Sequence, residues 1–491
     1  MPTTHAPRPH TVRTLLILGV AALAFALGQT TLIPAIPELA RELHTDASGV
    51  AWAMTGYLLA AAVCTPLVGR LGDMFGKRRL LVIALLAFAA GSIVSALGSA
   101  LWIVVAGRVM QGVGGGIFPL CFGIIRDEFP HARVARSVGL LSALAAIGGG
   151  LGLVIGGLVV DHVSYHWIFW IGAIMGLTAA LAAQLLVPES PIRSPGRVDI
   201  RGAVVLGVGL VLPLIGISQA HVWGWGSART LGLIAAGLVV LAGWVALERR
   251  TEQPLADIST LVKAPVLMTN LATLLVGFGM FGSFILIPQL AEAPTSTGYG
   301  LGLDATGAGL LMLPGSLLML VLGPFSGILG TRFGNKVPLA AGSLIASLGL
   351  LLLGVAHGST GEIVLFSALM FCGIGLAFAA MPNLIMEAVP PSQTGEATGF
   401  NALVRSVGAS VGTQVTATIL TASIAAGAVL PSSSGYTVAF VVSAAVAAVA
   451  ALAAVAIPRA SLQPHAHASA LDEMGAASPL GDPALASEGQ P

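Results

Sequence analysis

Long apolar stretches, separated by short polar segments, follow one another along almost the whole chain. About twenty apolar residues cross the hydrocarbon core of a bilayer as a helix, and backbone groups in lipid must find their partners within that helix. Fourteen stretches meet this requirement: residues 13–37, 49–69, 79–98, 101–125, 135–160, 166–187, 202–220, 229–247, 265–288, 303–327, 337–356, 362–386, 396–424 and 435–457. The pattern predicts an all-α polytopic membrane protein with 14 transmembrane helices.

The composition agrees with a protein that lies mostly in lipid. Of 491 residues, 56% are hydrophobic and 9% are charged, whereas about 25% of a soluble domain is charged. A net charge of +1 gives no reason to expect a nucleic-acid partner. Cys64, Cys121 and Cys372 all lie in apolar stretches and match no metal site. Since no constellation of catalytic side chains is recognisable, the sequence predicts no enzyme, no metal site and no cofactor.

Basic residues give the orientation of the helices. An even number of spans places both termini on one side, and the segments on that side carry eighteen of the basic residues. The opposite side carries only Arg41 and Arg229, while Arg108 and Arg405 fall within spans. The apolar stretch that begins near Leu15 is too long for a secretory signal. The sequence therefore predicts a multi-pass protein of the inner or plasma membrane, with both termini in the cytoplasm.

A short polar motif occurs twice. GRLGDMFGKR at 69–78 follows the second span, and GILGTRFGNK at 327–336 follows the tenth. The recurrence indicates an internal duplication, an architecture known from transporters. The predicted domains are a cytoplasmic tail at 1–12, a six-helix bundle at 13–187, two extra helices with linkers at 188–264, a second six-helix bundle at 265–457, and a disordered cytoplasmic tail at 458–491 that is rich in Ala, Ser and Pro.

Three further motifs extend this picture. They are RVMQGVGGG at 108–116 in the fourth span, AWAMTGYLLA at 51–60 in the second, and WGWG at 223–226 between the two extra helices. Together with the first polar motif they resemble the major facilitator superfamily, and above all its fourteen-helix branch of drug:proton antiporters of the EmrB/QacA type. The resemblance covers nearly all of residues 13–457. It implies a major facilitator fold of two six-helix bundles plus two extra central helices, which we expect to pack peripherally.

The resemblance also implies an activity. It predicts a secondary active transporter that exports a small, moderately hydrophobic organic compound, such as a drug or antibiotic, by alternating access in exchange for protons. The partners are then a small-molecule substrate, protons and the lipid bilayer, and we expect a monomer. Two alternatives stay open: a uniporter or importer of a small metabolite with the same fold, and a non-transporting membrane receptor on a transporter scaffold.

The first polar motif holds residues with a predicted role in conformational control. Gly69 permits the close approach of a neighbouring helix, as small residues do in membranes. Asp73 lies where the second span leaves the membrane, and its carboxylate can accept hydrogen bonds from the positive end of another helix. By resemblance, that helix is the second half's penultimate one, beginning near residues 395–398. An ordinary solvated turn is the alternative interpretation of the motif.

The basic residues of the motif are expected to form ion pairs with nearby acidic residues. Lys77 and Arg78 are expected to pair with Asp127 or Glu128 at the end of the fourth span. These contacts would hold the two halves together on the cytoplasmic side. The complete set of predicted gating residues is Gly69, Asp73, Gly76, Lys77, Arg78, Asp127, Gly152, Gly156 and Gly157.

The sequence departs from the fourteen-helix branch in three ways. Gly28 stands where the branch usually has an aspartate in the first span, and Leu153 replaces a proline within GGGLGLVIGG at 148–157. The glycine face of that segment is still expected to allow close contact between the halves. No carboxylate falls clearly in the middle of a span, although a buried ionisable group is the usual proton carrier. The candidates for proton coupling are therefore Arg108 and the helix-end acids Glu38 and Asp304, with Asp73 as a further possibility.

By resemblance, spans 1, 4, 9 and 12 line the cavity, joined by span 2. The substrate-binding candidates are Gln29, Thr30, Trp52, Tyr57, Gln111, Asn270, Phe278, Phe281, Asn383 and Arg405 of span 13. This mostly uncharged and aromatic set favours a neutral or weakly cationic compound over a strong anion. Backbone carbonyls are an alternative partner for Arg405. GFGMFG at 277–282 matches a dinucleotide-binding pattern, but it lies inside an apolar span, so we interpret its glycines as packing residues.

Overall fold

The computed structural model describes residues 11–45, 47–191, 199–252, 254, 256–425 and 430–458, so most of both predicted tails lies outside the described residues. The described chain forms helices joined by short turns, without a strand. The helices are α1 (Thr11–Thr30), α2 (Ile36–Glu42), α3 (Ala47–Phe75), α4 (Lys77–Ala96), α5 (Leu101–Gly112), α6 (Ile117–Glu128), α7 (His131–His162), α8 (His166–Leu186), α9 (Ile200–Ser218), α10 (Ala220–Trp223), α11 (Ala228–Glu248), α12 (Ile258–Leu261), α13 (Ala264–Glu292), α14 (Ala305–Phe333), α15 (Lys336–Val355), α16 (Thr360–Ala388), α17 (Thr394–Ala422) and α18 (Ser433–Val455).

The predicted membrane spans are present in the order in which the sequence places them. Thirteen segments of the described chain are long and apolar enough to cross a bilayer. The remaining predicted span corresponds to α17, which has 29 residues like α3 and α14 but is more polar. The fourth span is one continuous rod built from α5, a 3-10 segment at Val113–Gly116 and α6. The all-α polytopic fold is therefore confirmed.

The polar motif after the second span is mostly helical. We predicted that the span ends at Gly69 and that a loop follows, whereas α3 continues through the motif and Gly76 alone separates it from α4. Gly76 has a φ of 113° and Gly334, between α14 and α15, a φ of 89°. Glycine adopts such values readily, whereas side chains with a Cβ rarely do. The loop prediction was wrong because nothing interrupts the helical hydrogen bonds until this glycine. The first span is shorter than predicted, since α1 ends at Thr30.

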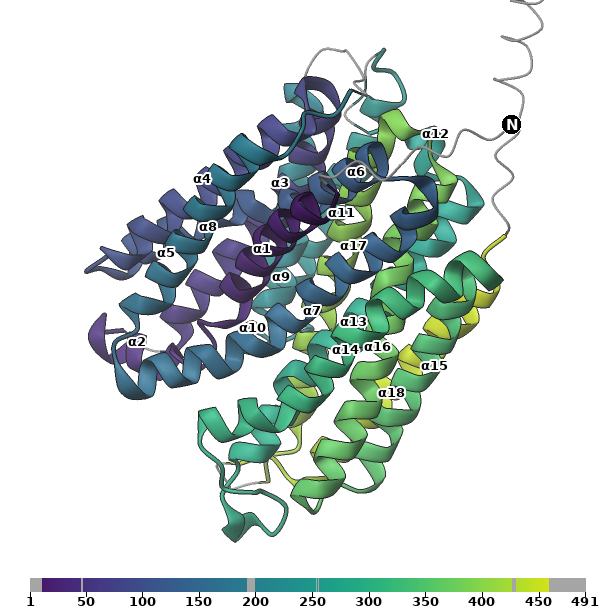
Figure 1. Ribbon diagram of the computed structural model, residues 1–491. Helices are drawn as coiled ribbons and strands as arrows, with labels where there is room; N and C mark the ends of the chain where they lie inside the picture. The colour runs from purple at the N-terminus through teal and green to yellow at the C-terminus, as the bar shows by residue number, and fades with distance from the viewer. Residues whose placement is uncertain are drawn as a thin grey trace, which may run out of the picture. The chain divides into compact units, whose positions relative to one another are not determined.

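Two groups of helices pack internally, and we call them the first half (α1 to α8) and the second half (α13 to α18). In Figure 1 the first half is purple to blue and the second green to yellow. Two pairs of corresponding helices have equal lengths, with 29 residues in α3 and α14 and 20 in α4 and α15. We call the end of the helices that holds the Gly76 and Gly334 turns the basic end, because most of the basic residues lie there.

The halves meet along two seams, one between α7 and α14 and the other between α3 and α17. Glycines bring the backbones together in both. A Cβ placed on Gly139 would lie 2.2 Å from the carbonyl oxygen of Gly323, and one placed on Gly69 would lie 2.3 Å from that of Gly395. Small residues allow helices in a membrane to approach in this way. The predicted close approach at Gly69 is thus present.

The glycines of α7 between residues 148 and 157 contact both halves. A Cβ on Gly152 would lie 2.0 Å from Thr30 Oγ1, and one on Gly156 would lie 2.3 Å from the Thr31 carbonyl oxygen. Gly152 and Gly156 therefore face α1 within the first half, whereas Cβ atoms on Gly149 and Gly150 would lie 3.7 Å from the Phe284 ring and 2.2 Å from Ser316 Oγ in the second half. The spacing of four residues between Gly152 and Gly156 places them on one face of the helix, and α1 occupies that face. Gly157 is buried as well.

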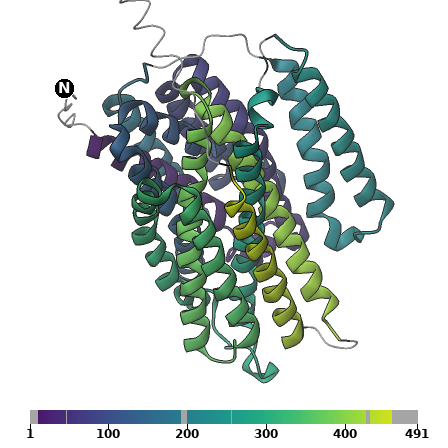
Figure 2. The ribbon, with the colours of Figure 1, turned by 90° about the vertical axis from the view of Figure 1, so that its right-hand side faces the viewer.

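The two extra helices, α9 and α11, form a hairpin that contacts both halves. Figure 2 shows the pair, in teal, at one edge of the helices. Ser218 at the end of α9 lies 3.2 Å from Thr55 of α3, hydroxyl to hydroxyl, while the indole of Trp225 donates to Thr418 of α17 at 2.6 Å. Trp244 of α11 stacks on Phe400 of α17. The hairpin is peripheral, as expected, but it also bridges the α3–α17 seam.

Candidate functional site

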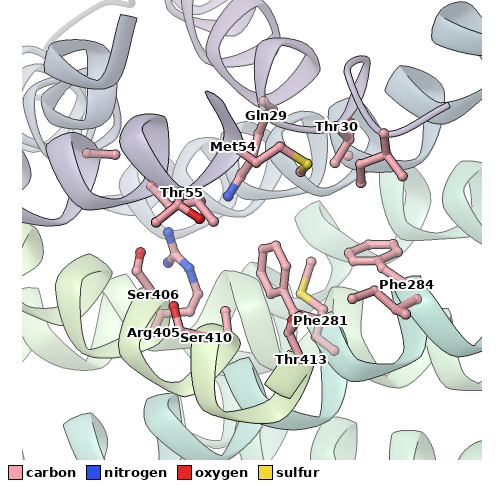
Figure 3. A pocket seen from close by; sticks show the side chains of 18 of the residues that line it. Gln29, Thr30, Met54, Thr55, Phe281, Phe284, Arg405, Ser406, Ser410 and Thr413 are labelled. Carbon is pink, nitrogen blue, oxygen red and sulfur yellow. The ribbon is translucent and has the colours of Figure 1, made fainter. Parts of the chain in front are cut away.

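A cavity of about 590 Å³ lies between the two halves, within the size range of small-molecule sites. Its walls come from α1, α3, α7, the hairpin, α13 and α17 (Figure 3). Most of the lining is apolar, and its aromatic members are Phe25, Phe118, Phe281, Phe284 and Phe378. The cavity is therefore suited to a moderately hydrophobic compound.

The α3–α17 seam explains why the cavity exists and where it is closed. Toward the basic end the helices touch, since a Cβ on Gly399 would lie 2.9 Å from the Thr65 carbonyl oxygen. Farther from that end both helices line the cavity, α3 with Leu58 and Thr55 and α17 with Arg405. The hairpin covers the place where the two helices separate, because Leu214, Ser218, Gln219 and Val222 also line the cavity.

A polar stripe on α17 forms one wall of the cavity. Its lining residues are Ala402, Arg405, Ser406, Ala409, Ser410, Thr413 and Gln414, and spacings of three and four residues place them on one helix face. Glycines hold this helix against α13. A Cβ on Gly408 would lie 2.0 Å from the carbonyl oxygen of Leu274, and one on Gly412 would lie 2.2 Å from that of Phe278. Gly277 of the GFGMFG stretch contacts the Arg405 backbone in the same way, so these glycines are packing residues.

Arg405 is the charged group in the interior of the cavity. Its guanidinium lies over the ring of Phe378, 4.6 Å from the ring centre. Figure 3 shows the side chain extending from α17 toward Thr55 on the opposite wall. In the described part of the chain, no hydrogen bond or ion pair is found for this guanidinium. The alternative in which it binds backbone carbonyls is not what the structure shows.

The structure brings together some of the predicted substrate-binding residues and separates others. Gln29, Thr30, Phe281 and Arg405 line the cavity, whereas Trp52, Tyr57, Gln111, Asn270, Phe278 and Asn383 do not. Two residues of the last group, Asn270 and Asn383, form hydrogen bonds within or between helices instead. Asn401 donates to Asn270 at 2.8 Å, and Asn383 donates to the Ala379 carbonyl at 3.1 Å. The prediction missed Thr55, Ser406, Ser410 and Thr413, although the helical spacing of the α17 residues around Arg405 is visible in the sequence.

Arg108 lies behind the cavity wall in a closed set of contacts. It donates to the Gly28 carbonyl and to the Gln111 side chain, both at 2.8 Å, and its guanidinium lies 4.2 Å from the centre of the Tyr57 ring. The Tyr57 hydroxyl in turn donates to the Phe25 carbonyl at 3.0 Å. The carbonyl of Gly28 thus accepts from Arg108 at the position where the resemblance expects an aspartate.

The two acids predicted to couple protons at helix ends lie at the surface. Glu38 forms an ion pair with Arg41 on α2. Asp304 is the N-cap of α14, where its carboxylate accepts a hydrogen bond from the Gly307 amide at 2.7 Å. Neither lines the cavity. Their contacts are those of a surface ion pair and of a helix cap.

Asp73 lies at the centre of a buried set of contacts at the basic end, which we call the latch: Arg70, Asp73, Lys77, Arg126, Asp127, Thr394 and Glu396. The Asp73 carboxylate accepts from the Glu396 amide at 3.0 Å, in the first turn of α17. It also lies 3.3 Å from the Lys77 ammonium, which lies 2.7 Å from Asp127. The predicted contact of Asp73 with a helix N-terminus and the predicted pair of Lys77 are both present.

Other latch contacts were not predicted. Arg126 of α6 donates to the Thr394 hydroxyl at 2.6 Å, and the Glu396 carboxylate lies 3.6 Å from Arg70. Arg78 pairs with Glu189 at 3.6 Å instead of with an acid of the fourth span. Glu189 follows α8 by only three residues, so the turn at Gly76 brings Arg78 to the start of the linker and not to α6.

The linkers on either side of the hairpin also reach the latch. Ser190, before the hairpin, donates to Asp127, and the backbone amide of Asp257, after it, donates to Glu396 at 2.6 Å. Partial burial acts to raise the pKa of Asp257, but hydrogen bonds from Ser259, Thr260 and Gln393 outweigh it, so this pKa lies below its ordinary value. Within the described ranges, no three His, Cys, Asp or Glu side chains are grouped to hold a metal ion.

The family profile of the major facilitator superfamily matches residues 18–413. The chain belongs to this superfamily. Curated relatives within it include the tetracenomycin C resistance and export protein of Streptomyces glaucescens, 29% identical over 94% of this chain and 85% of the relative. A multidrug resistance protein B homolog of Mycobacterium tuberculosis is 30% identical over 76% of this chain and 69% of the relative. The multidrug transporter MdtP of Bacillus subtilis is 27% identical over 84% of this chain and 76% of the relative.

Solved members of the superfamily show the same fold. The human organic anion transporter MFSD10 superposes with a TM-score of 0.64 at 16% identity, over 91% of this chain and 100% of its own. The proton:xylose symporter XylE superposes with a TM-score of 0.64 at 15% identity, over 91% of this chain and 96% of its own. Superfamily membership and these relatives point to transport through a membrane and not to catalysis.

Proposed function

We propose that this protein exports small, moderately hydrophobic organic compounds by alternating access, as a member of the fourteen-helix drug:proton antiporter branch. The observation that carries the proposal is a cavity between two halves that are held together at one end by the latch. Relatives named as export or multidrug resistance proteins support the direction and the substrate class. The bridging hairpin between the halves supports the branch.

The latch gives alternating access a physical basis. The positive end of α17 and Lys77 stabilise the Asp73 carboxylate together. With the latch formed, the basic end is closed. We place the basic end and both termini in the cytoplasm, so this arrangement is the one that faces outward. Breaking the Asp73–Glu396 contact frees α3 from α17 and allows the cavity to open toward the cytoplasm.

We propose proton exchange through the acids of the latch. Among the described cavity residues the only carboxylate is Glu292, at the end of α13, whereas Asp73 and Glu396 are both buried. Protonation of Asp73 would remove the charge that Lys77 and the α17 N-terminus stabilise, and so would favour the open basic end. Asp73 thus takes precedence over Glu38 and Asp304 as the coupling group.

Inverted membrane vesicles test the proposal. Vesicles that contain the full chain should accumulate a fluorescent hydrophobic compound when their interior is acidified, and the accumulation should collapse when a protonophore removes the pH gradient. Entry that ignores the gradient and stops at equal concentrations inside and outside would favour a uniporter. Gradient-driven loss of the compound from inverted vesicles would favour an importer, and no movement in any condition would favour a receptor.

A further inference from the structure

We propose that the cavity binds planar aromatic compounds that carry an ionised carboxylate or phenolate, and that Arg405 binds this group. The inference rests on the proposed function and names its substrate class. It revises the sequence-based expectation of a neutral or weakly cationic compound, because Arg405 is the charged group in the interior of an otherwise mostly apolar cavity.

The charge inside the cavity is unbalanced. Of the described residues that line it, only Arg405 and Glu292 are charged. Arg405 lies beside Gly277 on α13, and Glu292 lies fifteen residues farther along the same helix, which corresponds to about 22 Å at 1.5 Å per residue. Glu292 is also exposed. The carboxylate at the end of α13 therefore cannot pair with Arg405.

Among the described residues, no carboxylate pairs with the Arg405 guanidinium. The buried acids Asp73 and Glu396 are engaged at the basic end. A guanidinium without an anion is costly inside a membrane protein. An anionic ligand would supply the missing charge, whereas a cationic ligand would add to it.

The surroundings of Arg405 are arranged for recognition of an anion. Stacking on Phe378 holds the guanidinium plane in place, and a fixed guanidinium presents parallel N–H groups that match the two oxygens of a carboxylate. Ser406 and Ser410 follow it on the same face of α17, with Thr413 one turn farther on. Figure 3 shows Ser406 beside the guanidinium and Thr413 farther along α17, near Phe281. Ser406 donates to the Ala402 carbonyl at 3.0 Å, whereas the hydroxyl groups of Ser410 and Thr413 can donate to a phenolate or to a ring carbonyl of a ligand.

The opposite part of the cavity is arranged for an aromatic ring. Phe281 and Phe284 of α13 are in edge-to-face contact, with ring centres 5.6 Å apart. Phe25 and Phe118 of the first half make the same kind of pair at 5.7 Å. All four line the cavity, and Figure 3 shows Phe281 pointing between the halves. Aromatic side chains prefer offset or edge-on contact with another ring, so the site combines an anion-binding end with a ring-binding end.

Two dyes with the same xanthene ring system test the inference: fluorescein, which carries a carboxylate and a phenolate, and rhodamine 6G, which is a cation. Their dissociation constants are measured by equilibrium dialysis with the full chain in phosphatidylcholine nanodiscs, which contain no net anionic lipid to compete for Arg405. Wild type should bind fluorescein about tenfold or more tightly than rhodamine 6G, the size expected for a hydrogen-bonded charge pair. Adding phosphatidylglycerol should leave this preference in place if the ligand is the dye and not a lipid headgroup.

Variants of Arg405 complete the test. Arg405→Gln should weaken fluorescein binding about tenfold or more and leave rhodamine 6G unchanged or tighter. Arg405→Lys, which keeps the charge but loses the planar fork, should weaken fluorescein binding by a smaller factor and serves as the readout if the glutamine variant does not fold. Arg229→Gln, at an exposed position on α11, is the control and should change neither constant.

The outcomes separate this inference from the proposed function. Preferential binding of rhodamine 6G to wild type, or an equal loss of both dyes in Arg405→Gln, overturns the inference even if vesicles show export. Arg405-dependent binding of fluorescein without any export in vesicles overturns the proposed function and supports the anion site.

Discussion

Gly69 lies so close to α17 that no side chain fits there. The absence of a Cβ at this position determines how closely α3 and α17 approach. A Cβ there would lie 2.3 Å from the Gly395 carbonyl oxygen, whereas nothing lies within 4 Å of a Cβ on Gly243 of α11. We expect Gly69→Ala to lower the thermal unfolding midpoint in nanodiscs and to reduce transport, since such overpacking costs about 1–3 kcal/mol. Gly243→Ala is the matched control and should raise the midpoint or leave it unchanged, because alanine favours the helix. Equal shifts in both variants would contradict the close approach.

Asp73 is the second residue on which the closed basic end depends. Asp73→Asn keeps an acceptor for the Glu396 amide but removes the negative charge beside Lys77, and losing a charged hydrogen bond costs about 1.5–3 kcal/mol. We expect faster maleimide labelling of a cysteine placed at the buried Thr398, in a background without the three native cysteines. Glu252→Gln, at an exposed position, is the control. Labelling that is no faster than in the control would show that Asp73 does not hold this end closed.

At the scale of elements, the hairpin is attached to α17 through one defined hydrogen bond. Trp225 donates to Thr418 at 2.6 Å, and such a bond contributes about 1 kcal/mol. We expect Trp225→Phe and Thr418→Val each to lower the unfolding midpoint, and the double variant to lower it by less than the sum, because both remove the same contact. Trp102→Phe, at an exposed tryptophan, is the control for the loss of an indole. Additive effects would mean that the two side chains act independently.

The elements show what a sequence can and cannot predict. Apolar length alone placed fourteen spans, because lipid leaves the backbone few alternatives to a helix. It failed at the ends of α1 and α3, where helix termination depends on single residues such as Gly76 and not on hydrophobicity. Asp73 and Lys77 were predictable from the motif and its resemblance. Arg126 and Glu396 were not, because their contacts join segments more than 250 residues apart in the sequence, and no local pattern records that proximity.

At the scale of the whole molecule, the expected even number of spans makes the position of the termini testable. We expect a green fluorescent protein fused after the last residue to be fluorescent, since it folds in the cytoplasm. Alkaline phosphatase inserted at Gly298, in the exposed turn between α13 and α14, should be active because that turn is expected on the other side. The controls are green fluorescent protein inserted at Gly298, which should not be fluorescent, and alkaline phosphatase fused after the last residue, which should be inactive. Activity of the phosphatase at both positions would contradict the proposed orientation.

The attachment of the hairpin and its linkers to both halves has a mechanical consequence. Ser218 of α9 contacts Thr55, and Trp225 in the turn before α11 contacts Thr418, one on each half. The linkers contact Asp127 and Glu396, again one on each half. The two halves therefore cannot tilt relative to each other at either end while all four contacts persist. If transport proceeds by the proposed alternating access, the hairpin must move together with one half and slide along the other. Spin labels on α11 and on each half would reveal which half carries it, because only one of the two distances would stay constant.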